Sequence, residues 1–300
     1  MSCVFVAPVK TSVPLKTNFA RIPLVLLTLA SSCWAEIDTR GGQIEIGLVS
    51  EVRSIQPGKP FSIALRIAHA PEWHTYWKSP GIVGVATRLE WTLPAGFEAG
   101  EIQWPPPETV PMSSLTAWGY EREVLLMVEI SPPADLEAGS KVDLNAKGAW
   151  MACARSCHPG FGDFELTLPV SDAAEPDFDP AFRDQFEAER ASLPGDLDGW
   201  TAAVEKSSST EIVLTLTPNE PTDPEKLDGV YFFSYDNQVD SDAEQHVEIL
   251  PNGEIQIRLA HPDFAPENPD ALAGLVFNPN GWLEADGARF ARVSAAWKKD

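Results

Sequence analysis

Apolar and polar residues alternate in short runs through most of the chain, which is the pattern of β-strands that bury one face. Residues that favour turns, mainly Pro and Gly, separate one run from the next. In the first half of the chain the runs lie at residues 43–49, 61–67, 89–93, 123–130, 141–146 and 164–170. Several strands of this length, broken by turns, predict an all-β fold of the sandwich type.

An acidic, Pro-containing stretch follows the last of these runs and suits a linker. Within it, Asp179-Pro180 has the residue types expected at the N-cap and first position of a helix. Residues 181–191 then carry a helical pattern, and Leu193-Pro194-Gly195 is expected to end the helix. The sequence therefore predicts a linker over residues 172–198 that contains one short helix.

A second set of alternating runs begins at Trp200. Pro251-Asn252-Gly253 lies between two of them, and Asn-Gly in that position is a strong signal for a β-hairpin. The runs are at residues 211–216, 229–234, 246–250, 254–259, 273–277 and 290–293. They predict a second, smaller β-sandwich-like domain over residues 199–300. It holds no cysteine and no catalytic constellation, so its expected role is structural or partner-facing.

Residues 1–35 have the features of a secretory signal peptide. An apolar run at 24–30 follows a basic segment and is too short to span a bilayer. Small residues at Cys33 and Ala35 suit a cleavage site, so Glu36 is expected to begin the mature chain, with lipid attachment at Cys33 as the alternative. No later segment looks transmembrane. The expected location is the periplasm, an oxidising compartment.

The chain is strongly acidic. It has 44 acidic residues against 22 basic ones, and three of the basic residues lie in the signal, which leaves the mature chain with a charge of −25. Such a charge argues against nucleic acid or an anionic membrane surface as the partner, because phosphate groups need basic counter-charge. The first domain of the mature chain is expected over residues 36–171. Net charge does not identify its function, so individual side chains have to be considered.

Only two of the four cysteines, Cys153 and Cys157, lie beyond the predicted signal. A disulfide between them would close a very short loop, which stabilises a fold by about 2 kcal/mol against about 4 or more for a long loop. A structural disulfide therefore stays open but is not favoured by the spacing. Thiol-disulfide exchange is a second possibility, since Arg155 and His158 could favour a thiolate. Pro159-Gly160 is expected to turn the chain away and leave the second sulfur accessible.

Metal binding is a third possibility. Two thiolates and an imidazole could hold Cu(I), with Cys153, Cys157 and His158 as ligands, and His74 or His69 as other candidate imidazoles. Zinc suits the segment less well, because a closed structural site usually has four ligands. The residues alone leave exchange, metal binding and a structural disulfide open.

Five blocks along the first domain occur in an order that closely resembles the N-terminal periplasmic domain of the DsbD-type thiol:disulfide interchange proteins. The resemblance covers residues 37–170, and residues 199–300 resemble, more weakly, a second β domain of some longer relatives. The blocks are His74-Thr75-Tyr76-Trp77-Lys78-Ser79-Pro80-Gly81, Leu89-Glu90-Trp91-Thr92-Leu93-Pro94-Ala95-Gly96-Phe97, Glu101-Ile102-Gln103-Trp104-Pro105-Pro106-Pro107, Gly119-Tyr120-Glu121 with Val124-Leu125-Leu126, and Lys147-Gly148-Ala149-Trp150 leading into the cysteines.

The resemblance implies an immunoglobulin-like sandwich with the cysteines exposed at one end. It implies a thiol-disulfide oxidoreductase that needs no bound cofactor, in which Cys157 forms the mixed disulfide and Cys153 resolves it. His74 and Tyr76 would lie near the sulfurs. Copper binding by the same cysteines, or a non-catalytic interaction domain with a structural disulfide, are the alternatives.

The resemblance also implies partners. Reducing equivalents would come from a thioredoxin-like electron donor through a membrane electron-transfer protein, and would pass to a periplasmic disulfide isomerase or a cytochrome c maturation thioredoxin. The sequence stops at Asp300 without the membrane and thioredoxin domains, so the donor is expected to be a separate protein. Relatives often shield the disulfide with an aromatic residue. Here the matching residues 110–118 contain no Phe, and Met112 or Leu115 are the candidates.

Overall fold

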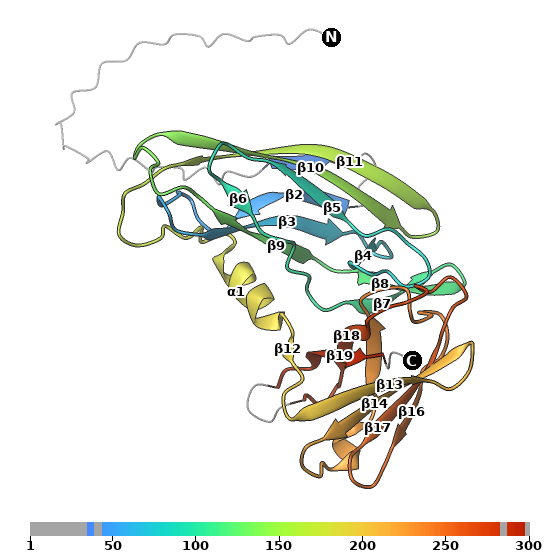
Figure 1. Ribbon diagram of the computed structural model, residues 1–300. Coiled ribbons are helices and arrows are strands. Elements are labelled where there is room, and N and C mark those ends of the chain that lie inside the picture. Colours follow the sequence, from blue (N-terminus) through green and yellow to red (C-terminus); the bar gives the residue numbers. More distant parts are fainter. Residues whose placement is uncertain (1–34, 39–43, 283–286, 298–300) are drawn as a thin grey trace, which may run out of the picture. The chain divides into compact units, whose positions relative to one another are not determined.

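The computed structural model describes residues 35–38, 44–282 and 287–297 (Figure 1). Strands make up two β regions, and a single α-helix lies between them in the sequence. The predicted all-β fold is confirmed. The predicted signal peptide and its cleavage site lie outside the described residues, except for Ala35. Across the described part of the chain, no helix has both the length and the apolar character that a membrane crossing requires.

Three sheets build the first β region. The largest has the order β1-β2-β3-β9-β6, with β1 Ala35–Asp38, β2 Ile44–Ser50, β3 Phe61–His69, β9 Val124–Ser131 and β6 Glu98–Ala99. The second has the order β11-β10-β5, with β11 Cys157–Pro169, β10 Lys141–Cys153 and β5 Arg88–Thr92. The third has the order β4-β8-β7, with β4 Thr75–Tyr76, β8 Leu115–Tyr120 and β7 Glu108–Met112.

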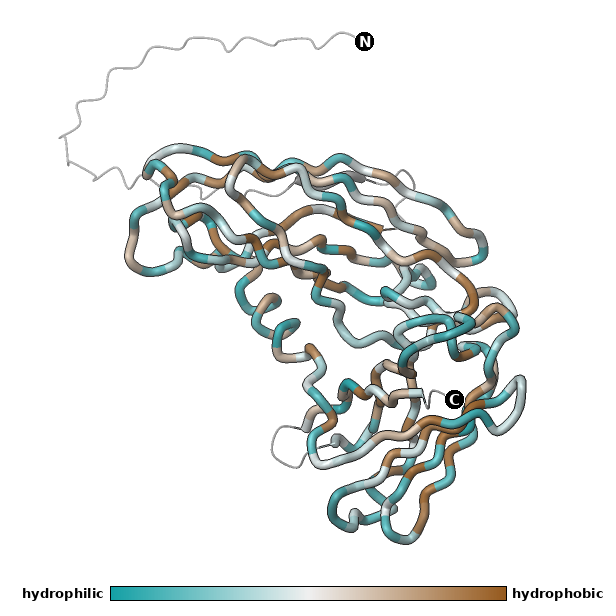
Figure 2. Tube along the Cα trace, in the orientation of Figure 1, coloured by the Kyte–Doolittle hydropathy of each residue, from teal (hydrophilic) through white to brown (hydrophobic). Residues whose placement is uncertain are grey.

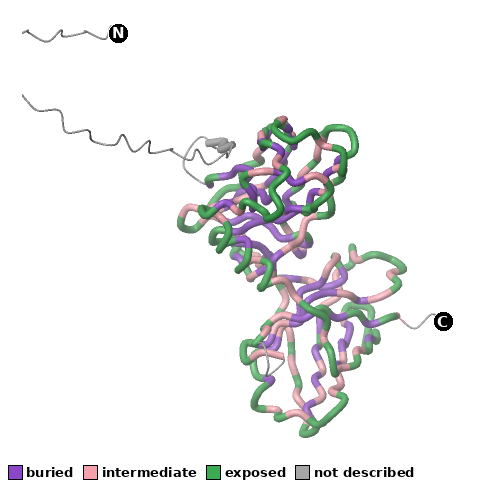
Figure 3. The backbone as a smooth tube through the Cα atoms, turned by 90° about the vertical axis from the view of Figure 1, so that its left-hand side faces the viewer, coloured by how far each residue is buried: buried purple, intermediate pink, exposed green. Residues whose placement is uncertain are grey.

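The first two sheets share a hydrophobic core. Alternate residues of β3, such as Ile63, Leu65 and Ile67, are fully buried and belong to the same cluster as Leu144 and Phe164 from the β10–β11 pair. Figure 3 shows this buried interior in purple. Because strand side chains alternate between faces, one face of each sheet supplies the core. Figure 2 shows hydrophobic residues in brown alternating with hydrophilic residues in teal along these strands.

Helix α1, Arg183–Ser192, explains why β3 is also buried on its other face. Phe186 is completely buried in a separate cluster with Ala64 of β3 and with Leu125 and Met127 of β9. The predicted stop at Leu193 is confirmed, since that residue is the C-cap. The helix begins at Arg183, two residues later than predicted. Asp179 still makes the contacts expected of an N-cap: its side chain accepts a hydrogen bond from Ala181 N–H at 3.0 Å, and its carbonyl accepts one from Arg183 N–H at 2.9 Å.

The second β region contains two four-stranded sheets. One has the order β13-β14-β17-β16, with β13 Trp200–Lys206, β14 Glu211–Pro218, β17 Ile255–Ala260 and β16 His246–Ile249. The other has the order β12-β19-β18-β15, with β12 Gly195–Asp196, β19 Phe290–Ala296, β18 Ala271–Phe277 and β15 Tyr231–Ser234. A 3-10 helix, η1, spans Pro224–Leu227. The predicted hairpin at Asn252-Gly253 is confirmed by the pairing of β16 with β17.

Strands β10 and β11 are much longer than the runs 141–146 and 164–170 predict. Each has 13 residues, and they pair without interruption from Lys141 opposite Pro169 to Cys153 opposite Cys157. The glycines inside these strands do not end the strands. They leave room for large aromatic rings. A Cβ at Gly160 would lie 2.2 Å from the Trp150 ring, closer than any atom can approach. The two cysteines therefore stand at the tip of a rigid hairpin.

Candidate functional site

The β10–β11 hairpin brings Cys153 and Cys157 together. They are directly paired, with Cα atoms 4.1 Å apart, and their sulfurs form a disulfide. The three-residue turn between them is closed by a hydrogen bond from Ala154 N–H to the Ser156 carbonyl at 3.2 Å. The turn expected at Pro159-Gly160 is wrong, because both residues lie within β11. Cys157 is accessible because it begins the strand at the end of the hairpin.

The two sulfur-bearing residues differ sharply in exposure. Cys153 has no exposed surface, whereas Cys157 is exposed. Thiol-disulfide exchange needs a thiolate to reach one sulfur while the other leaves. The geometry therefore favours attack at Cys157, with Cys153 as the leaving group. Arg155, expected near the thiols, lies exposed in the turn between the two strands.

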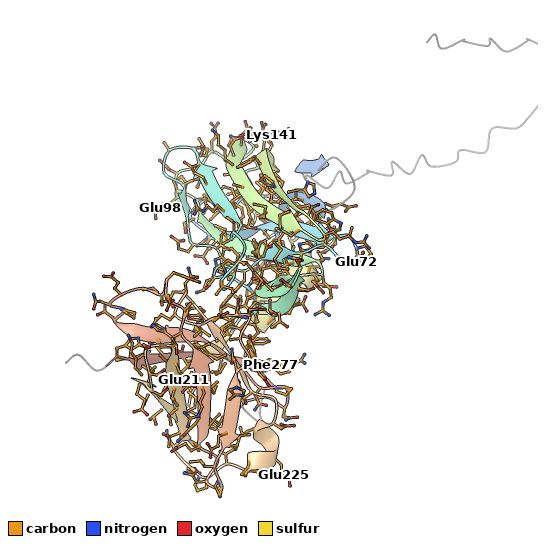
Figure 4. The ribbon with its side chains drawn as sticks, turned by 90° about the vertical axis from the view of Figure 1, so that its right-hand side faces the viewer. Glu72, Glu98, Lys141, Glu211, Glu225 and Phe277 are labelled. Carbon is orange, nitrogen blue, oxygen red and sulfur yellow. A yellow bond between two sulfur atoms is a disulfide. The ribbon has the colours of Figure 1, made fainter. Side chains whose placement is uncertain are left out.

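His74 and Tyr76 reach the buried sulfur from the segment that leads into and forms β4. The backbone of His74 pairs with that of Cys153 through N–O distances of 2.9 and 3.0 Å. The Tyr76 hydroxyl donates a hydrogen bond to Cys153 Sγ at 3.0 Å, and His74 Nε2 lies 3.4 Å from the same hydroxyl. Both residues expected near the sulfurs are thus beside Cys153. Figure 4 labels Glu72, two residues before His74, and Lys141, at the opposite end of β10 from the disulfide.

Burial sets the protonation states around the buried sulfur. It lowers the pKa of His74, and it raises the pKa of the Tyr76 phenol to about 12. Burial also lowers the pKa of His69 to about 4, opposed by a hydrogen bond to the Arg122 carbonyl and assisted by His74. At neutral pH both imidazoles are therefore neutral and Tyr76 keeps its proton. The Tyr76 phenol therefore has a proton to donate to Cys153 Sγ at neutral pH.

His158 follows Cys157 directly but takes a different position. Successive residues of a strand point to opposite faces, so its side chain lies on the other face of the hairpin from that of Cys157. Its Nε2 lies 2.8 Å from Ser156 Oγ, and its ring packs 5.5 Å from that of Trp73. Within the described ranges, no cluster of three or more His, Cys, Asp or Glu side chains has the arrangement of a metal site.

A second hairpin lies over the disulfide. We call β7–β8 the cap hairpin; its turn is Ser113-Ser114, and Ser113 has a positive φ of 60°. Met112, the last residue before this turn, places Sδ 3.6 Å from Cys157 Sγ and 3.5 Å from the Tyr76 hydroxyl. Of the two candidates for a shielding residue, Met112 is the one in contact with the sulfurs. The remaining wall of the site is apolar and contains Val110 and Ala117, both buried with Cys153.

Two comparisons with known proteins bear on this site. Residues 48–169 match the family model of the N-terminal domain of the thiol:disulfide interchange protein DsbD. The crystal structure of the N-terminal periplasmic domain of ScsB from Proteus mirabilis is similar in fold, with a TM-score of 0.57 and 16% identity over 89% of this chain and 98% of that one. Because neither β region alone makes up 89% of the chain, this similarity of fold extends over both.

Two other results add nothing to the argument. The crystal structure of Spo0M, a sporulation control protein from Bacillus subtilis, aligns over 85% of this chain and 91% of that one at 10% identity, but its TM-score is 0.22. No protein with a curated description matches this chain. The similarity of this chain to known proteins therefore rests on the family match and on the fold shared with the ScsB domain.

Proposed function

We propose, on the premise that residues 48–169 are a DsbD-type N-terminal domain, that this protein carries reducing equivalents in the periplasm through Cys153 and Cys157. One observation supports this most directly. An exposed sulfur is bonded to a completely buried one, and the buried sulfur accepts a hydrogen bond from Tyr76. A disulfide that only stabilises the fold has no need of an accessible sulfur.

The reduction of the pair follows from this asymmetry. A thiolate of the donor attacks Cys157 Sγ, the bond between the two sulfurs breaks, and Cys153 leaves as a thiolate beside the Tyr76 hydroxyl. A second donor thiolate attacks the donor sulfur of the mixed disulfide and releases Cys157. The donor becomes a disulfide, and this protein gains two electrons and, with protonation, two protons.

Delivery to a client runs in the other direction. The Cys157 thiolate attacks a client disulfide and forms a mixed disulfide, releasing one client thiolate. The Cys153 thiolate then attacks Cys157 Sγ, re-forms the internal disulfide and releases the second client thiolate. We propose a thioredoxin-like protein, fed by a membrane electron-transfer protein, as the donor. A periplasmic disulfide isomerase or a cytochrome c maturation thioredoxin is the proposed client.

The reduction potential of the Cys153–Cys157 pair tests this proposal. Metal-free protein would be equilibrated in glutathione or dithiothreitol redox buffers, with thiol alkylation or Trp150 fluorescence reporting the state. A value of roughly −180 to −270 mV lies among those of exchange proteins and is the expected result. A value below about −300 mV marks a disulfide that resists reduction. It would overturn the proposal in favour of a structural disulfide.

Replacing Tyr76 by Phe should slow reduction by a small thiol by roughly ten- to hundredfold, because a hydrogen bond to a charged leaving group is worth about 1.5–3 kcal/mol. Stopped-flow reduction by dithiothreitol measures the rate. Tyr120→Phe is the matched control, since that buried phenol donates instead to the Pro105 carbonyl at 2.8 Å. Equal slowing in both variants would show that the phenol at position 76 has no special role in the reaction.

Copper binding is a second candidate, and the position of Met112 favours it. In the reduced protein its thioether would stand beside two thiolates, and sulfur ligands of both kinds suit Cu(I). His158, expected as a ligand, contacts Ser156 instead. Cu(I) titration of the reduced protein against a chelator tests this, and Met112→Leu removes the proposed third ligand.

A further inference from the structure

The second β region contacts the cap hairpin at Thr116. The contacts come from the loop of residues 235–245 between β15 and β16, which we call the clamp loop. Asp242 Oδ1 accepts a hydrogen bond from Thr116 N–H at 2.8 Å, and Ser241 Oγ donates one to the Thr116 carbonyl at 2.7 Å. Both backbone groups of a single residue in the cap hairpin are therefore bound by the clamp loop.

The strand pairing of the cap hairpin explains why the N–H and carbonyl of Thr116 are available to the clamp loop. In an antiparallel pair, every second residue of a strand directs its N–H and C=O away from the partner strand. Thr116 is such a residue of β8, as is Trp118, whose carbonyl accepts from Trp77 N–H at 3.0 Å on the edge away from β7. Along this edge, β4 pairs with β8 only at Tyr120 and Gly119 and does not extend to Thr116. The clamp loop occupies the place that a longer β4 would take.

A hydrogen bond and a close backbone approach hold the clamp loop against the first β region. Ser241 is 2% exposed and accepts a hydrogen bond from Ile82 N–H at 3.1 Å. Gly81 has a φ of +86°, and a Cβ there would lie 2.1 Å from Ser241 Oγ, so only glycine allows this approach. Two residues beyond Thr116, Trp118 donates from Nε1 to the Tyr231 hydroxyl at 3.2 Å. Contacts thus extend from the second β region along the cap hairpin.

The clamped residue is close to the redox site. Met112 is paired with Leu115, the neighbour of Thr116, and Met112 Sδ lies 3.6 Å from Cys157 Sγ. Met112 therefore covers one side of the otherwise exposed Cys157 sulfur, and a protein partner that approaches from this side has to displace it. The hydrogen bonds at Thr116 oppose movement of the hairpin that carries Met112.

We propose that the second β region is a clamp on the cap hairpin and sets how often Met112 uncovers Cys157, and therefore how fast partner thiolates react. This inference rests on the proposed function and deepens it. It assigns a role to residues 235–245 in a region without cysteines. Ser241 and Asp242 act as positioning residues, since neither contacts a sulfur.

The test compares the rate at which excess dithiothreitol reduces the disulfide in the full chain. Asp242→Ala should accelerate reduction by roughly three- to tenfold, the equivalent of one hydrogen bond. Asp242→Asn keeps the Oδ1 acceptor and should restore the wild-type rate. Glu244→Ala, which removes an exposed carboxylate from the same loop, is the matched control and should leave the rate unchanged.

A double-mutant cycle shows whether the effect passes through the cap. Met112→Ala alone should accelerate reduction, and adding Asp242→Ala should give no further increase, because the shielding side chain is already gone. Full additivity would overturn the clamp. So would a wild-type rate in Asp242→Ala beside a faster Met112→Ala. In either case the proposed function would stand, because it depends on the separately measured reduction potential.

Discussion

Replacing Cys157 by Ser is expected to abolish disulfide exchange, with a loss on the order of a thousandfold or more. Cys157 is the exposed sulfur and Cys153 is fully buried, so the remaining thiol cannot reach a partner disulfide. Exchange would be followed by the reduction of a model disulfide-bonded protein, with alkylation of the products. The variant should remain folded, because a disulfide closing so short a loop stabilises the protein by only about 2 kcal/mol.

The Cys153→Ser variant is the informative control. It keeps the attacking thiol and removes the resolving one, so it should accumulate a mixed disulfide with the client that persists until an added thiol cleaves it. Non-reducing electrophoresis detects that species. If Cys153→Ser failed to trap a client while Cys157→Ser trapped one, the assignment of the two roles would be reversed. Equal exchange by wild type and Cys157→Ser would remove the carrier function.

Replacing Trp118 by Ala should lower the free energy of unfolding by about 3–5 kcal/mol. The side chain is completely buried on β8. Its ring lies 5.5 Å from Phe233 and 6.5 Å from Trp77, and Nε1 donates to Tyr231, so the substitution leaves a cavity between strands of both β regions. Urea denaturation followed by far-ultraviolet circular dichroism gives the free energy.

Trp118→Phe separates the two contributions at this position. It keeps an aromatic ring and loses the hydrogen bond, so its cost should be clearly smaller than that of the alanine variant. A loss below about 1 kcal/mol for Trp118→Ala would mean that the site collapses freely around the missing ring. The aromatic contacts would then not couple the two regions.

Strands with regular alternation could be predicted from the sequence, while elements that depend on other parts of the chain could not. The runs at 61–67 and 123–130 became β3 and β9 almost unchanged. The strands of the cap hairpin show no regular alternation in the sequence. Pro111 lies within β7, and the turn Ser113-Ser114 directly follows that strand. In β10 and β11, glycines that resemble breaks leave room for the rings of Trp150 and Phe164.

The candidate site was predictable as a set of residues but not as an arrangement. Spacing and resemblance identified Cys153, Cys157, His74 and Tyr76. The residues around the cysteines in the sequence do not indicate that one of them is buried. The side chains that contact the sulfurs come from elsewhere: Tyr76 lies 77 residues before Cys153, and Met112 lies 45 residues before Cys157. The hydrogen bond from Thr116 N–H to Asp242 joins residues 126 positions apart, and the sequence predicts only a structural or partner-facing role for the second β region.

The 13-residue pairing of β10 with β11 has a consequence for the lifetime of mixed disulfides. The ladder holds the two cysteine-bearing backbones together whether or not the sulfurs are bonded, so reduction need not separate them. The free Cys153 thiolate then faces Cys157 at an effective concentration far above that of any thiol in solution. Intramolecular closure should outcompete outside thiols, which makes each encounter with a client brief and commits the chain to releasing it.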